Sequence, residues 1–284
     1  MVRSADELVT LLDLETIDVD LYRGAQPRTG LQRVFGGQVA AQALVAGART
    51  VDAERTVHSL HSYFLRPGDT AVPIVFDVER IRDGRSFSTR RVVARQHGRP
   101  IYYMTASFQV GEGGYDHQDA MPATIPPERA TDVADLIRRG SPEGAERWME
   151  EWAALDMRWV GDSTHDLADP EHPALSRLWI RVAGPLGEEP LAHRAALAYA
   201  SDLTLLGSAL VPHGVHIGDP SVQSASLDHT IWFHRPFRAD QWLLYDQVSP
   251  SASGARGLAI GRLFTVDGVL VATVAQEGLI RPRG

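Results

Sequence analysis

The sequence predicts an α+β fold in which one unit, a buried helix followed by long antiparallel strands, occurs twice. The first observation is a pair of similar stretches, VHSLHSYFLRP (57–67) and SLDHTIWFHRPF (226–237). Aligning the Arg-Pro pair in each stretch gives an offset of 169 residues. A helical segment rich in Ala and Leu precedes each stretch, and segments of alternating polarity follow it. In each half we therefore expect a sheet that wraps around a central helix.

The helix of the first unit is expected in VFGGQVAAQALVAGA (34–48), which is apolar on most sides, as a buried helix must be. Strands are expected in PIVFDVERI (73–81) and VVARQHGRPIYYMTASF (92–108), because apolar and polar residues alternate there. His97 and Gly98 mark a tight hairpin turn within the second of these segments.

The second unit repeats this order. Its helix is expected in HRAALAYASDLTLLGSALV (193–211), and its strands in WLLYDQVS (242–249) and RLFTVDGVLVATV (262–274). Asp267 and Gly268 favour a tight two-residue turn between the last two strands. The offset of 169 residues holds over about fifty residues without a gap, which indicates a duplicated domain.

The segment between the two units differs in composition. Residues 111–132 are rich in Gly and Pro and are typical of a linker. Residues 132–156 predict short exposed helices, and residues 163–177 predict a loop.

The composition excludes several classes of site and partner. All 28 basic residues are Arg, and the absence of Cys and Lys excludes disulfides, thiolate nucleophiles, Cys-zinc sites and Schiff-base lysines. The net charge of −8 gives no electrostatic reason to expect nucleic acid binding. No apolar run is long enough to span a bilayer, and the acidic N-terminus lacks the pattern of a signal peptide. We therefore expect a cytoplasmic protein that binds neither nucleic acid nor membrane.

Asp202 is the charged residue that stands out, because it is the only one in AALAYASDLTLLGSALV (195–211). Helical spacing would place it on a stripe with Ala198, Tyr199 and Leu205. A carboxylate in apolar surroundings is costly unless it is hydrogen-bonded or faces a cavity. Asp202 is therefore a candidate general base, and the alternative is a structural aspartate at a helix end.

Gln276 and Ser226 are two further candidates. Strand alternation places Gln276 on an apolar face, where its amide needs a partner: a water, a substrate carbonyl or the backbone. Alternation groups Ser226 with Asp228 and places His229 on the opposite face unless a bulge intervenes. This argues against a Ser–His nucleophile pair, and no GxSxG motif is present. We interpret Ser226 as a positioning hydroxyl.

Three other features each allow two interpretations. Gly36 and Gly37 open the first helix, either to leave N–H groups free for an anion or carbonyl, or to permit tight packing. Seven arginines within residues 80–99 suit phosphate groups or a solvated strand edge. His213 and His216 have ligand-like spacing but lack an HExxH motif or a neighbouring carboxylate, so we expect no metal site.

Many motifs in this order resemble those of the type II acyl-CoA thioesterase family. The resemblance covers both halves, from about residue 8 to residue 281, and is weakest at 115–175. The motifs that carry it are VFGGQVAAQAL, VHSLHSYFLRPGD, RDGRSFSTRRV, PIYYMTASFQ, YASDL, SLDHTIWFHRPF, WLLYDQ, SGARG and DGVLVATVAQEG.

The resemblance implies a double hotdog fold. Each of two tandem hotdog domains would have a central helix wrapped by an antiparallel sheet, and the two sheets would pair. We expect an N-terminal domain over residues 1–113, a linker over 114–149 and a C-terminal domain over 150–284. The two similar stretches would then be the same strand in each domain.

The resemblance also implies a reaction, the hydrolysis of acyl-CoA to free fatty acid and CoA without a metal or organic cofactor. The family's catalytic positions correspond to Asp202, Ser226 (where Thr is common) and Gln276 in this chain. The three would hold and deprotonate a water that attacks the thioester carbonyl, and N–H groups at a helix N-terminus would stabilise the oxyanion. The first helix has no acid like Asp202, and the offset carries Gln276 to Ser107, so we expect one working site per chain.

Two alternative functions use the same fold. A hotdog-type enoyl-CoA hydratase would need an Asp and a His that converge on one substrate, and an acyl-CoA binding or sensor protein would bind without turnover. The expected partner is an acyl-CoA in fatty acid metabolism, and we expect a homo-oligomer, a dimer or a tetramer.

Overall fold

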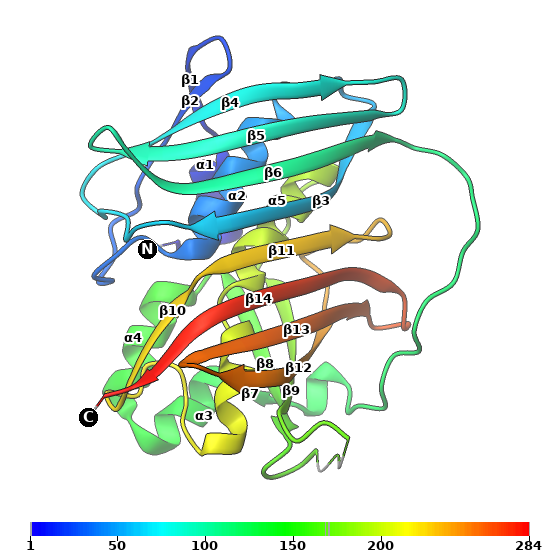
Figure 1. The fold of residues 1–284 in the computed structure, drawn as a ribbon. Coiled ribbons are helices and arrows are strands. Elements are labelled where there is room, and N and C mark those ends of the chain that lie inside the picture. The colour runs from blue at the N-terminus through cyan, green and yellow to red at the C-terminus, as the bar shows by residue number, and fades with distance from the viewer. Residues whose placement is uncertain (1, 168, 170, 284) are drawn as a thin grey trace.

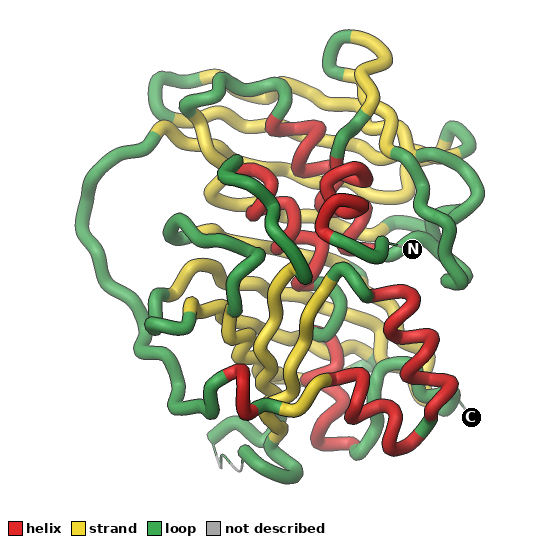
Figure 2. Tube along the Cα trace, turned by 180° about the vertical axis from the view of Figure 1, so that it is seen from behind, coloured by secondary structure: helices red, strands yellow, loops and turns green. Residues whose placement is uncertain are grey.

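A computed structural model describes residues 2–167, 169 and 171–283. Across these residues, fourteen antiparallel strands form one continuous sheet (Figure 1). Figure 2 shows the opposite side, where the helices lie against the sheet. This is the α+β arrangement with two similar halves that the sequence predicts.

The first half forms one end of the sheet around a central helix. Its elements are α1 (Ala5–Leu12), β1 (Glu15–Asp18), β2 (Leu21–Gly24), α2 (Gly36–Ala48), β3 (Arg55–Phe64), β4 (Ile74–Asp83), β5 (Phe87–Gln96) and β6 (Arg99–Val110). The central helix α2 is buried from Gly37 to Gly47, as its Ala-rich and Leu-rich sequence predicts.

The connection to the second half runs outside the sheet without helix or strand over residues 111–126 (Figure 1). It continues through η1 (Pro127–Arg129), β7 (Thr131–Asp132), α3 (Val133–Gly140) and α4 (Pro142–Trp152). The two short helices lie where short exposed helices are predicted. The proposed domain boundaries stay a prediction.

The second half repeats the helix and sheet. Its elements are β8 (Leu155–Asp162), β9 (Leu175–Val182), α5 (Pro190–Ser201), η2 (Leu205–His213), β10 (Val222–Ser226), β11 (Asp228–Phe233), β12 (Leu243–Ser253), β13 (Arg256–Thr265) and β14 (Leu270–Pro282). The helices α2 and α5 pack so closely that a Cβ at Gly37 would collide with the carbonyl oxygen of Tyr199.

The two similar stretches of the sequence pair with each other at the centre of the sheet. Strand β3 lies antiparallel to β11, with Leu60 opposite Ile231 and His61 opposite Thr230 (Figure 1). Leu60 and Ile231 are fully buried, so this join is also part of the core. The repeated sequence therefore forms the strand that joins the halves.

The second central helix is shorter than predicted. The segment 193–211 does not continue as one α-helix: α5 ends at Ser201, and η2 begins at Leu205. The Tyr245 hydroxyl donates to the carbonyl oxygen of Ser201 at 3.0 Å, which satisfies one of the carbonyl groups that a helix end leaves free. The break places Asp202 at the end of α5, which agrees with the alternative prediction of an aspartate at a helix end.

The two hairpins also differ from each other. His97 and Gly98 form the predicted tight turn, both with positive φ, between the paired residues Gln96 and Arg99. The second hairpin is longer than predicted, because pairing stops at Phe264 opposite Leu270. The extra length shifts β14 by one residue against the alignment predicted from the repeat.

The segment Pro190–His213 is long and apolar enough to cross a membrane by length and composition. It consists of α5 and η2, and 72% of its most apolar window is buried inside the fold. Burial in the core accounts for this apolar run.

Candidate active site

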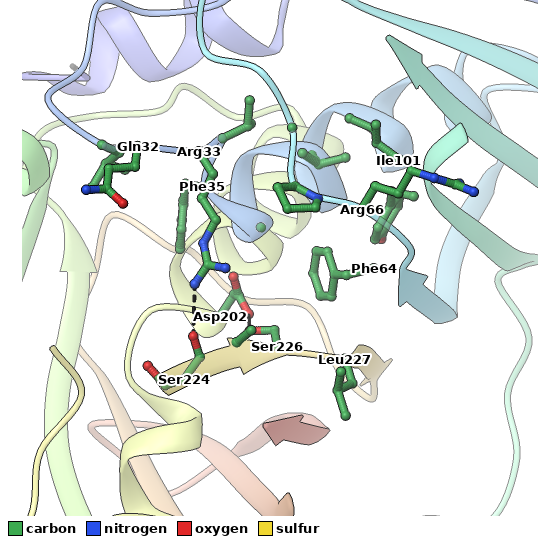
Figure 3. Close-up of a pocket in the computed structure, with 18 of the residues that line it drawn as sticks. Gln32, Arg33, Phe35, Phe64, Arg66, Ile101, Asp202, Ser224, Ser226 and Leu227 are labelled. Atoms are coloured by element: carbon green, nitrogen blue, oxygen red, sulfur yellow. Dashed lines mark hydrogen bonds between the residues drawn. The ribbon is translucent and has the colours of Figure 1, made fainter. Parts of the chain in front are cut away.

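A cavity of about 550 Å³ lies where the two halves meet (Figure 3). The start of α2, the end of β3 and the start of β6 contribute its walls from the first half. The segment after α5 and strand β10 contribute its walls from the second half. Asp202 and Ser226, two of the three predicted catalytic residues, line this cavity.

The structure brings all three predicted side chains together. The Ser226 hydroxyl donates to Asp202 Oδ1 at 3.0 Å, and the Gln276 amide nitrogen donates to the same oxygen. Asp202 is 9% exposed and Gln276 is fully buried. The partner that the Gln276 amide requires on this apolar strand face is thus the carboxylate of Asp202. The catalytic roles of the three residues stay predictions.

Both donors hold one oxygen of the carboxylate, so the other oxygen is directed elsewhere. Asp202 Oδ2 lies 2.5 Å from the position that a Cβ at Gly36 would occupy, at the first residue of α2. Gln276 Oε1 is buried and has no hydrogen-bond partner among the described residues. Asp202 lines the cavity, so its Oδ2 is placed to accept a hydrogen bond from a molecule there, whereas Gln276 is buried behind Asp202 and does not line the cavity.

The electrostatics of the site follow from two helix ends. Asp202 lies at the C-terminal end of α5, where the helix dipole is unfavourable for an anion. The N-terminal end of α2 faces it, and within the described part of the chain no side chain caps that end. The free N–H groups of α2 offset the cost of the carboxylate and can also polarise a carbonyl. Each of the two interpretations of the glycine pair applies to one residue: Gly36 lies beside Asp202 in the site, and Gly37 permits the close packing of α2 against α5.

A second polar layer lies behind Asp202. The buried His229 contacts the Ser201 hydroxyl through Nε2 at 2.9 Å, and Ser201 directly precedes Asp202. Burial lowers the pKa of His229, and the nearby charge of Asp202 acts in the opposite direction. Burial also raises the pKa of Tyr102, and a hydrogen bond with Ser62 acts in the opposite direction. Sequence reasoning missed Tyr102, because nothing in its strand pattern separates it from a core tyrosine.

His229 and Ser226 both face inward, which corrects the simple strand alternation. Ser226 points to Asp202, and His229 points to Ser201 on the same side of the sheet. The bulge that alternation left as a condition is present between them. The two side chains still do not form a Ser–His pair, because each bonds to a different residue.

The cavity walls are largely apolar and end at a polar opening. Phe35 packs edge-to-face against Trp152 and Tyr199, with ring centroids 4.7 and 5.2 Å apart. The basic side chains among the described lining residues are Arg33 and Arg66, both exposed. Arg33 donates to the carbonyl oxygen of Ser224 at 2.9 Å (Figure 3). An apolar wall beside an opening with two guanidinium groups suits a ligand with an apolar end and an anionic end.

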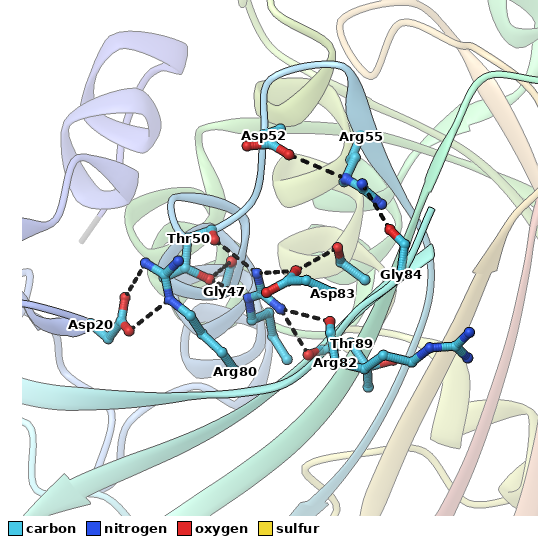
Figure 4. A network of polar contacts seen from close by, with 12 residues as sticks. Asp20, Gly47, Thr50, Asp52, Arg55, Arg80, Arg82, Asp83, Gly84 and Thr89 are labelled. Atoms are coloured by element: carbon cyan, nitrogen blue, oxygen red, sulfur yellow. Dashed lines mark hydrogen bonds and ion pairs between the residues drawn. The ribbon is translucent and has the colours of Figure 1, made fainter. Parts of the chain in front are cut away.

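In the described part of the first half, a different polar network lies at the end of the central helix (Figure 4). At the end of α2, the buried Arg90 donates to the Thr50 carbonyl at 2.9 Å and to Asp83 at 2.7 Å. The strand pairing makes Ala106 the counterpart of Gln276, and not the predicted Ser107, because of the one-residue shift of β14. A guanidinium and a methyl group therefore stand where the second half has an acid and an amide.

The arginine-rich segment 80–99 does not reach the cavity. Arg80 pairs with Asp20 at 2.8 Å (Figure 4). Arg90 is buried, and Arg91 pairs with Glu79. In the described ranges, no group of three His, Asp or Glu side chains is placed to hold a metal ion. These observations leave the cavity between the halves as the candidate site.

Known proteins resemble this chain over nearly its whole length. The family profile described as acyl-CoA thioesterase N-terminal domain matches residues 25–109, and the profile described as acyl-CoA thioesterase matches residues 166–279. Human acyl-coenzyme A thioesterase 8 is 42% identical, over 96% of this chain and 88% of its own length. The crystal structure of an acyl-CoA thioesterase II from Mycobacterium marinum is 48% identical, with a TM-score of 0.85 over 98% of this chain and 99% of that one.

A solved structure supports the predicted fold. A conserved protein of unknown function with a hot dog fold from Alicyclobacillus acidocaldarius superposes with a TM-score of 0.78. It is 21% identical, and the match covers 98% of each chain, so this likeness concerns the fold alone. The predicted hotdog architecture is confirmed.

Proposed function

This chain belongs to the acyl-CoA thioesterase family, and on that premise we propose that it hydrolyses acyl-CoA thioesters by water attack at Asp202. The observation that carries the mechanism is the meeting of Asp202, Ser226 and Gln276 beside the start of α2. The products are a free fatty acid and CoA, and the enzyme is a thioester hydrolase.

The proposed reaction begins with a water held by Asp202 Oδ2, which accepts no hydrogen bond from the described residues, while Ser226 and Gln276 hold Oδ1. Asp202 accepts a proton as the water oxygen attacks the thioester carbonyl. The N–H groups at the start of α2 stabilise the oxyanion of the tetrahedral intermediate. Collapse of the intermediate breaks the carbon–sulfur bond, and the proton on Asp202 passes to the leaving thiolate. Ser226 and Gln276 keep the carboxylate in place throughout.

The proposed binding mode follows from the cavity. The acyl chain lies against the apolar walls, and the phosphate groups of CoA lie at the opening near Arg33 and Arg66. We propose one such site per chain, because Arg90 and Ala106 occupy the corresponding place in the first half.

Release of CoA thiol from a panel of acyl-CoA esters tests the proposed function. We expect turnover that survives EDTA, since no step uses a metal. Binding without release would favour an acyl-CoA sensor, and addition of water to an enoyl-CoA would favour a hydratase. Against the hydratase, His229 is fully buried and is not among the residues that line the cavity.

Replacing Ser226 by alanine should lower kcat on the order of tenfold to a hundredfold, the loss of one hydrogen bond to a charged group. The loss is smaller than that expected for Asp202, because Gln276 still holds the same oxygen. Steady-state thiol release measures it, and Ser226→Thr, which keeps the hydroxyl, is the matched control. Equal loss in both variants would contradict the positioning role of the hydroxyl.

Replacing Trp152 by alanine should shift the preference toward longer acyl chains. Trp152 lies between the main cavity and a small neighbouring cavity of about 20 Å³, and it lines both. With the indole removed the two cavities join, and two more buried methylenes would favour the longer substrate by on the order of tenfold in kcat/KM. Trp148→Ala is the matched control, because Trp148 contacts Trp152 but lines neither cavity. The same chain-length profile in both variants would show that Trp152 does not limit the length of the acyl chain.

We further propose that the enzyme acts in fatty acid metabolism in the cytoplasm, as a homo-oligomer. The outer face of the sheet supports the assembly, since Tyr63 is 51% exposed and Trp232 is 37% exposed beside the join of β3 and β11. Light scattering coupled to size exclusion tests it, and a monomer at micromolar concentration would contradict the proposal.

A further inference from the structure

The strand that carries Ser226 contains one extra residue directly at the site. Strand β10 pairs with β14 up to Ser226 opposite Gly278, and β11 resumes with Thr230 opposite Ala275. Three residues of one strand (227–229) therefore face two residues of the other. Because β14 pairs with β13 without interruption through the same stretch, the extra residue belongs to the strand of Ser226. This is a β-bulge.

The bulge decides which way the Ser226 hydroxyl points. In a regular strand, residues three positions apart face opposite sides, yet Ser226 and His229 both face inward. If the register of β11 continued without the bulge, Leu227 would lie opposite Gly278 on the inner side. Ser226 would then turn outward, away from Asp202. Contact between the hydroxyl and the carboxylate depends on the extra residue.

A side chain replaces the backbone hydrogen bond that the bulge interrupts. The N–H group of Glu277 donates to Asp228 Oδ1 at 2.7 Å instead of to a carbonyl of the neighbouring strand. Leu227, between β10 and β11, bonds to the strand on each side: its N–H donates to the Glu277 carbonyl of β14 at 2.9 Å, and its carbonyl accepts from Phe64 N of β3 at 2.9 Å. Glu277 directly follows Gln276. The carboxylate of Asp228 therefore fixes β14 next to the amide that holds Asp202.

The first half supplies an internal comparison. It has a bulge at the corresponding place, between Val57 and Ser59, but pairing resumes at once with Ser59 opposite Ser107. The offset of 169 residues makes Ser59 the counterpart of Asp228. The half without the catalytic residues thus closes its bulge with backbone pairing, and the half that contains them uses a carboxylate.

We propose that Asp228 is a positioning residue for the hydrolysis, which acts by holding the bulge open so that Ser226 and Gln276 meet on Asp202. The inference rests on the proposed function. Burial raises the pKa of Asp228, the hydrogen bond from the Glu277 amide acts in the opposite direction, and the charge of Glu277 adds to the rise. An asparagine would keep the acceptor oxygen without the charge.

Two variants separate the hydrogen bond from the charge. Asp228→Ala removes the acceptor, and we expect kcat to fall on the order of tenfold, with KM within about twofold of wild type. Asp228→Asn keeps the acceptor and should retain kcat within about threefold. Ser59→Ala, at the same place in the first bulge, is the matched control and should leave kcat unchanged. Hydrogen exchange of the Glu277 amide should be slow in wild type and in Asp228→Asn, and fast in Asp228→Ala.

Several results would overturn the proposal. Unchanged kcat in Asp228→Ala, or equal loss in Asp228→Asn, would show that the acceptor oxygen does not position the site. If Asp228→Ala fails to fold, fast exchange of the Glu277 amide in folded wild type would still contradict it. A wild-type protein that releases no thiol would reject the proposed function, whereas the exchange experiment would still report on the bulge.

Discussion

Replacing Asp202 by asparagine should lower kcat by on the order of a thousandfold while acyl-CoA still binds, because the variant loses its general base. Asparagine has nearly the same size, so Ser226 and the start of α2 keep their places. It cannot accept a proton from water, which is the step assigned to Asp202. Thiol release under single-turnover conditions measures the chemical step, and calorimetry with a non-hydrolysable acyl-CoA analogue measures binding.

The matched control is Asp228→Asn, which makes the same change at a half-buried carboxylate one hydrogen bond away from the site. We expect this control to retain most of its activity. If Asp202→Asn also keeps its rate within tenfold of wild type, Asp202 is not the base, and the proposed mechanism is wrong.

Replacing Gly36 by alanine should lower kcat by about a hundredfold or more. The added Cβ would lie 2.5 Å from Asp202 Oδ2 and 2.9 Å from the Phe64 ring, closer than any van der Waals contact allows. Either the carboxylate rotates or the start of α2 moves, and a displacement of about 1 Å in a catalytic group costs about that factor. Steady-state thiol release, with circular dichroism to verify the fold, measures the effect.

Gly47→Ala in the same helix is the matched control. A Cβ at Gly47 would lie 3.3 Å from a methyl group of Val92, and alanine favours the helix by about 1 kcal/mol relative to glycine. We expect full activity from this variant and a stability close to that of wild type, because the tight contact with the buried Val92 offsets the gain in helix propensity. Full activity in Gly36→Ala as well would mean that the start of α2 does not face the reacting carbonyl.

Much of this fold could be predicted because a duplicated sequence gives the same local signals twice. The buried helix around Ala40 follows from an Ala-rich and Leu-rich segment that is apolar on most sides. The pairing of the strands that contain Leu60 and Ile231 was implied by the family resemblance and not by the periodicity of either strand. The polar residues Asp202 and Gln276 could be found because each interrupts an apolar face, and such groups require partners.

The rest of the site depends on contacts that are distant in sequence. The end of α5 is stabilised by Tyr245, whose hydroxyl donates to the Ser201 carbonyl from 44 residues away in the sequence. The bulge at Ser226 depends on pairing with β14, so it cannot be predicted from the alternation of polar and apolar residues within one strand. Trp152 and Tyr102 line the cavity only because α4 and β6 pack beside it. Periodicity describes one element at a time and cannot provide these relations.

The crystal structure of Asp202→Asn with an intact acyl-CoA bound tests the central claim most directly. The account predicts that the thioester carbonyl accepts a hydrogen bond from an N–H group at the start of α2. It also predicts a water between residue 202 and the carbonyl carbon, on the path of attack. A thioester bound elsewhere in the protein, or a carbonyl turned away from both α2 and residue 202, would contradict it.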